Sequence, residues 1–204
     1  LEADPDYAIT HHHQGIPTDP DTDEPSVMSV MASFGEHYLD HAPFYDGESP
    51  VEDNVNPFIS RETSDRSLRL NRLVHDRLAE TTDPWDDFDT VTRYGYTTLW
   101  GSYLDALCPV TNAAGMLYEV SGQSDSVGSR AYGQKVEASR VGFVETFKAL
   151  AEDAHLSGVD EQSYFDIPLA GEGYVDDDEG TGRAAARGRA ARPRSSPVAN
   201  DAFK

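Results

Sequence analysis

The sequence is poor in cysteine, lysine and long apolar runs, and each shortage excludes a class of protein. Its 204 residues include a single cysteine, Cys108, which excludes an internal disulfide framework and a zinc finger built on cysteines. No apolar run approaches the length of a membrane-spanning helix. The sequence also contains no Gly-rich phosphate loop and no Gly-x-Ser-x-Gly nucleophile motif. A functional site must therefore be sought among other residue types.

Positive charge is scarce, since 16 Lys and Arg, only three of them lysine, face 37 Asp and Glu, for a net charge of −21. A surface this acidic repels nucleic acids and anionic membranes, so neither is an expected partner. An intrinsically disordered acidic chain is one interpretation, but 38% hydrophobic and 10% aromatic residues favour a folded domain. We predict a globular protein adapted to high salt, which screens the self-repulsion. The charge leaves the oligomeric state open and does not separate a cytoplasmic from a secreted protein.

The expected elements alternate between strands and helices, which favours an α/β domain with a mixed sheet flanked by helices. Helix-breaking residues and apolar runs predict strands at 6–10, 27–34, 89–96 and 113–120. Helices are expected at 64–81, 102–107 and 128–153, with a single turn near Glu36–Asp40 inside an irregular 36–60. Ser64 is the expected N-cap of the first helix. The apolar residues expected to face inward are Leu68, Leu70, Leu73, Val74 and Leu78 in that helix, and Val136, Val141, Val144, Phe147 and Leu150 in the last.

The composition changes after residue 174, which we take as the end of the domain. Residues 175–179 are an acidic run, and residues 180–204 carry six Lys and Arg against one Asp. Repeats of Arg, Ala and Gly are typical of disorder, so 175–204 is predicted to be a disordered tail. It is either an arginine-rich arm for nucleic acid or, the interpretation we favour, a dispensable extension. Because the chain opens with Leu1 and soon enters a strand, we also expect a fragment or a processed piece.

Three consecutive histidines, His11, His12 and His13, follow the first predicted strand. They could be the remnant of an affinity tag, or one metal ligand with two neighbours. The strand before them and Gly15 after them are unlike a tag, and α/β sheets place their sites where strands end in such loops. An imidazole can bind zinc at neutral pH.

Glu119 ends an apolar run that begins at Gly115 and is predicted to be a buried strand. A buried carboxylate needs a partner or a function, because burying it unpaired is costly. A salt bridge to Arg93 or Arg130 would be a structural role. A carboxylate beside zinc-bound water could instead act as a general base.

Taken in order, these residues resemble the C-terminal half of a zinc carboxypeptidase of the metallocarboxypeptidase family, in particular its acidic haloarchaeal members. The similarity covers about residues 6–155 and rests on the histidine stretch, Tyr96, Gly101-Ser102-Tyr103-Leu104-Asp105 and Glu119, with 23 residues from the tyrosine to the glutamate. The resemblance implies that His12 is the third zinc ligand and that Glu119 is the catalytic glutamate. It further implies that Tyr96 and Asp105 bind a peptide or amide substrate.

The family's His-x-x-Glu zinc ligands and its Asn-Arg pair precede the third histidine, and neither is found before His12 in this sequence. Asn71-Arg72 follows His12 in a predicted helix, so no role is carried over to it. We therefore expect a fragment that lacks two zinc ligands and is inactive alone. The alternative is a non-catalytic acidic α/β module that binds a peptide or partner without metal.

Overall fold

The computed structural model describes residues 5–13, 26–41, 55–81, 90–93, 108–120 and 132–169. Within them lie four strands, β1 (Tyr7–His13), β2 (Ser26–Ala32), β3 (Thr90–Arg93) and β4 (Ala114–Val120). The described residues also form two long helices, α1 (Arg61–Glu80) and α3 (Tyr132–Glu152). There are three short 3₁₀ helices among them, η1 (Glu36–His41), η3 (Cys108–Thr111) and η4 (Glu161–Asp166). The predicted α/β class is confirmed at this level.

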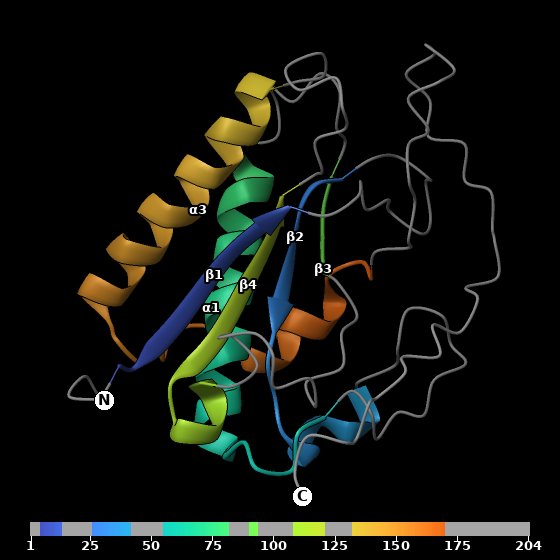
Figure 1. The fold of residues 1–204 in the computed structure, drawn as a ribbon, viewed down its shortest axis with the longest axis vertical. Coiled ribbons are helices and arrows are strands. Elements are labelled where there is room, and N and C mark those ends of the chain that lie inside the picture. The colour runs from blue at the N-terminus through green and yellow to red at the C-terminus, as the bar shows by residue number, and fades with distance from the viewer. Residues whose placement is uncertain are drawn as a thin grey trace, which may run out of the picture.

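The four strands form one mixed sheet in the order β1-β4-β2-β3. β1 runs parallel to β4, β2 runs parallel to β3, and the central pair β2 and β4 is antiparallel. Figure 1 shows α1 and α3 side by side behind the sheet, and both helices contact β2 and β4. The sheet therefore has one face covered by the two long helices and an opposite face that they do not cover.

The core lies between the sheet and α1, and here the predicted apolar stripe is confirmed. Leu68, Leu70, Val74 and Leu78 are fully buried, and Leu73 packs partly against the same cluster. The strands also contribute fully buried residues, among them Met28, Val30 and Met116. Apolar burial of this kind, at about 25 cal/mol per Å², is the main stabilising contribution to the fold.

The start of α1 differs from the prediction by one helical turn. Ser60 is the N-cap, because its hydroxyl accepts a hydrogen bond from the Thr63 amide at 3.2 Å. Ser64 lies inside the helix, where its hydroxyl donates to the Ser60 carbonyl and accepts from the Gly35 amide. Both serines satisfy the cap rule in the sequence, and the contact with Gly35 decides between them.

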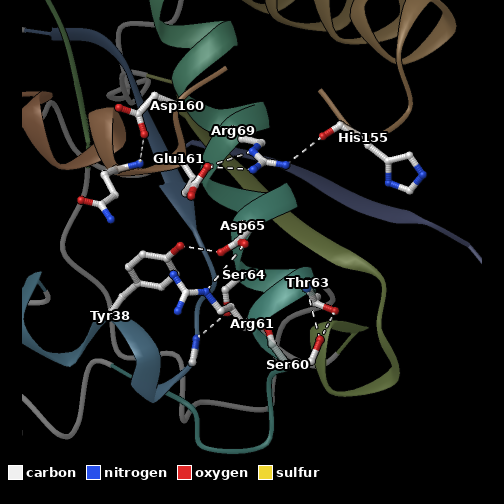
Figure 2. Close-up of polar contacts among 12 residues, drawn as sticks. Tyr38, Ser60, Arg61, Thr63, Ser64, Asp65, Arg69, His155, Asp160 and Glu161 are labelled. Atoms are coloured by element: carbon white, nitrogen blue, oxygen red, sulfur yellow. Dashed lines mark hydrogen bonds and ion pairs between the residues drawn. The ribbon is translucent and has the colours of Figure 1, made fainter. Parts of the chain in front are cut away.

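Polar contacts fix the short helices η1 and η4 to α1 (Figure 2). Tyr38 of η1 donates a short hydrogen bond to Asp65, and Arg69 binds Glu161 of η4 at 2.8 Å. Beside them, Phe165 packs edge-on against Phe34. These contacts support the helix-covered side and lie away from the residues considered as a functional site.

The outer helix differs from its predicted packing at two positions. Val136 and Phe147 of α3 were expected to face inward, but they are 50% and 67% exposed, while Ala138 and Val141 are buried. Because an α-helix has 3.6 residues per turn, residues spaced three apart lie at progressively different angles around its axis. Such a series that starts at the buried Val141 has therefore turned away from the buried face by Phe147.

Candidate functional site

The alternation of strand residues sends neighbouring histidines of β1 to opposite faces of the sheet. His11 points toward the helices, where its ring stacks on Phe143 of α3 with centroids 3.8 Å apart and also meets Tyr118. His12 is on the uncovered face. The two side chains therefore lie in different environments although they are adjacent in the chain.

His12 and Glu119 form the centre of the candidate site. They are register partners on the neighbouring parallel strands β1 and β4, near the carboxyl end of each. The His12 Nδ1 atom lies 3.2 Å from the Glu119 Oε2 atom. The His12 side chain is 49% exposed and that of Glu119 only 10%. The structure therefore brings together the two residues that sequence reasoning placed about a hundred positions apart.

Two hydroxyl residues continue the same row across the sheet. Glu119 pairs in register with Ser29 of β2, and Ser29 pairs with Thr92 of β3. The Ser29 and Thr92 hydroxyls lie 2.6 Å apart, and both residues are fully buried. The row His12–Glu119–Ser29–Thr92 thus spans all four strands on one face.

The hydroxyl chain directs its protons away from Glu119. Ser26 donates to the Met28 carbonyl at 2.7 Å, and Thr92 donates to the Ser26 hydroxyl at 3.3 Å. Because Thr92 donates its hydroxyl proton to Ser26, Ser29 is the donor in the bond between Ser29 and Thr92. In the contact between His12 and Glu119, the ring donates when Nδ1 carries the proton.

His11 is held in its neutral form. Burial lowers the pKa of His11 to about 4, and its Nε2 atom has no hydrogen-bond partner within the described part of the chain. Of these two histidines, His12 is the one that faces Glu119.

Of the other residues predicted to act at the site or to pair with Glu119, one lies away from it and the rest are outside the described residues. Arg93, the suggested salt-bridge partner of Glu119, donates instead to the Ile167 carbonyl at 2.9 Å and stacks over the Tyr164 ring. Tyr96, Asp105 and Arg130 lie outside the described residues, as does the predicted tail from 175 to 204.

Asn71 and Arg72 have structural contacts. The buried Asn71 amide donates to the Ser67 carbonyl within α1, and Arg72 donates to the Ser163 carbonyl. This agrees with leaving both residues out of the site.

Sequence reasoning missed Ser29 and Thr92 as members of the row. Ser29 lies between Met28 and Val30 in a strand whose other polar residue is Ser26 at its start, and this is the one signal of it in the sequence. Nothing in the sequence states the register that places Ser29 beside Glu119, because that depends on how β2 pairs with β4.

The donor set suits one part of a zinc site. The His12 ring offers a nitrogen of the kind that binds zinc, and the Glu119 carboxylate lies next to that ring. In the regions that the structure describes, no three His, Cys, Asp or Glu side chains are grouped closely enough to hold a metal ion. His12 and Glu119 therefore fit a ligand and its neighbouring carboxylate, and any further ligands would come from outside these regions.

Compared with known proteins, the chain matches no protein-family model, no curated protein and no solved structure. The resemblance to zinc carboxypeptidases thus stays a prediction. A search of the described helices finds none long and apolar enough to cross a membrane.

Proposed function

We propose that this chain is part of a zinc-dependent peptide hydrolase of the carboxypeptidase type, in which His12 is one zinc ligand and Glu119 the general base. The observation that carries the proposal is the 3.2 Å contact between His12 and Glu119 at the carboxyl ends of two parallel strands. A site where strand ends meet is the usual place for ligands in α/β sheets.

The two residues would divide the work by their positions. His12, half exposed, would bind the metal through a ring nitrogen. Glu119, its register partner on β4, would take a proton from the attacking water. The carboxyl group would then pass this proton to the leaving amine. A bound zinc ion would lower the pKa of its water and polarise the scissile carbonyl.

Burial suits Glu119 for this role. Its side chain is mostly removed from solvent, which keeps bulk water away from the carboxylate. A catalytic zinc has three protein ligands and an open position, so the proposal requires two more ligands, which we place in an upstream His-x-x-Glu segment. We also assign Tyr96 and Asp105 to substrate binding on the strength of the resemblance alone.

Zinc titration tests the proposal directly. Isothermal calorimetry on the chain itself should show weak zinc binding that His12→Ala abolishes, because one ligand cannot hold zinc tightly. His155→Ala removes an exposed histidine elsewhere and should leave the titration unchanged. With an upstream His-x-x-Glu segment present, zinc content should approach one per chain and fall in His12→Ala. Zinc binding that is indifferent to His12 would refute the proposal.

A further inference from the structure

Arg93, at the end of β3, differs from the other arginines of the described residues in its partners. The others each lie within 4.0 Å of a carboxylate oxygen; they are Arg61, Arg66, Arg69, Arg72, Arg77 and Arg140. Within the part of the chain that the structure describes, no carboxylate forms an ion pair with Arg93. In a chain with 37 Asp and Glu against 16 Lys and Arg, an arginine without an acidic partner needs a reason.

The Arg93 guanidinium is held in one orientation beside η4, which lies at the end of β3 (Figure 1). Its Nε atom donates to the Ile167 carbonyl at 2.9 Å. Its central carbon lies 5.8 Å from the ring centroids of both Tyr164 and Phe165, a cation–π arrangement. The backbone is fixed as well, because the Arg93 amide donates to the Pro168 carbonyl at 2.8 Å. A side chain that is already ordered loses little rotamer entropy when a ligand binds.

The two aromatic rings beside Arg93 belong to the core. Tyr164 is fully buried, and its hydroxyl accepts a hydrogen bond from the Ala32 amide at 3.2 Å. Phe165 packs edge-on against Phe34, with centroids 5.5 Å apart. The position of the guanidinium is therefore set by the packing between β2 and η4.

The outer nitrogens of Arg93 remain available for a ligand. Only Nε has a hydrogen-bond partner, and neither Nη atom is among the buried polar atoms that lack one, so both Nη atoms reach solvent. Burial of the rest of the side chain lowers the pKa of Arg93, because its charge is partly removed from water with no anion beside it. The N–H groups of the two Nη atoms form a planar fork whose spacing matches the two oxygens of a carboxylate.

We propose that Arg93 binds the carboxylate group of a ligand through paired hydrogen bonds from its two Nη atoms. A carboxylate carries one negative charge, which the single cation of this site neutralises. A phosphate dianion would keep one charge uncompensated in a chain of net charge −21. Thr92 and Arg93 are consecutive in β3 and point to opposite faces, so this site is separate from the row that includes Glu119 and does not depend on the proposed zinc site.

Nitrogen-15 NMR of the full chain tests the proposal, with acetate as the probe. Potassium acetate replaces KCl at constant ionic strength, so that the screening of the net charge stays the same. The Arg93 Nε–H signal and the Leu169 amide signal should shift and saturate at millimolar acetate. Acetamide has nearly the same shape without the charge and should leave both signals in place. A wild-type titration without a saturable shift overturns the proposal, as does tighter binding of inorganic phosphate than of acetate.

A short peptide with a free C-terminus, compared with its amidated form, identifies the source of the carboxylate. If the free peptide saturates the shift at lower concentration than acetate and the amidated peptide does not bind, the ligand is a peptide. If acetate binds at least as tightly as the free peptide, the ligand is a free organic acid. Both results support the carboxylate site, whereas equal binding of the free and amidated peptides contradicts it.

Variants show whether the guanidinium itself is the receptor, with the Leu169 amide as the reporter. Arg93→Lys keeps the charge but loses the planar fork, so the acetate dissociation constant should rise at least about tenfold. Arg93→Gln should abolish the saturable shift. Arg140→Gln is the matched control, because it removes the same charge from an exposed arginine of α3 and should leave the titration unchanged. Circular dichroism checks that each variant keeps its helix content, and a loss of binding in Arg140→Gln equal to that in Arg93→Gln overturns the proposal.

Discussion

His11 and His12 are neighbours in the chain, yet the two faces of the sheet give them opposite properties. On the helix-covered face, His11 is stacked between Phe143 and Tyr118, and its pKa is lowered to about 4 because burial penalises the charged ring. On the other face, His12 is half exposed and bound to Glu119. Adjacent positions of β1 therefore hold one histidine that packs against the helices and one that belongs to the candidate site.

The same division applies to the residues beside them. Tyr118 and Glu119 are consecutive in β4, and both are buried. The Tyr118 hydroxyl shares a 2.5 Å hydrogen bond with Thr146 of α3. Glu119 turns to the row that includes Ser29 and Thr92. Burial alone thus does not separate the residues packed against the helices from those of the candidate site, whereas the face of the sheet does.

The largest effect is expected from Glu119→Gln, on the uncovered face. In the zinc-loaded protein that the proposed function implies, the amide keeps the shape of the side chain but cannot accept the proton. Activity on peptide substrates should fall about 10²–10⁴-fold, while zinc content stays unchanged. The control Glu62→Gln alters an exposed residue of α1 and should retain activity. Full activity in Glu119→Gln would mean that Glu119 is not the general base.

Loss of packing on the helix-covered face should affect stability instead. Met116→Ala empties a fully buried position of β4 and should lower the free energy of unfolding by about 2–5 kcal/mol. Val136→Ala, at a half-exposed position of α3, should change it by no more than about 0.5 kcal/mol. Urea unfolding in high salt measures both. Equal losses from the two variants would contradict the burial of Met116 beneath the helices and the exposure of Val136.

A smaller effect is expected from the charge on His11. The unfolded ring takes up a proton near pH 6.5, but the folded ring does so only near pH 4. As the pH falls from 6.5 to 4, the unfolded state is stabilised first, so the free energy of unfolding should fall by on the order of 1–3 kcal/mol and then level off. His11→Phe should reduce this dependence of the free energy of unfolding on pH.

The variant His12→Gln provides the comparison, since its ring is on the other face. His75, whose pKa is also lowered mainly by burial, should leave a residual slope in both variants. Thermal unfolding measured across this pH range would show the difference. Identical slopes for the wild type and His11→Phe would mean that the stacked ring is not the group that titrates.

Some features of this protein follow from the sequence alone, because they depend on local spacing. The alternation of apolar strands and amphipathic helices predicts the α/β class, and Leu68, Leu70, Val74 and Leu78 predict the buried side of α1. The buried strand that carries Glu119 is also predicted, since its apolar run is continuous from Ala114 to Tyr118. These patterns lie within a few residues of one another, where backbone geometry determines the period.

Other features were decided only by the tertiary structure. The choice of Ser60 over Ser64 as the cap, and the exposure of Val136 and Phe147, depend on which neighbour each helix meets. Likewise, the sequence cannot say that β1 and β4 are adjacent and in register. That pairing of segments about a hundred residues apart depends on the whole sheet order β1-β4-β2-β3, and it alone brings the His12 ring to the Glu119 carboxylate.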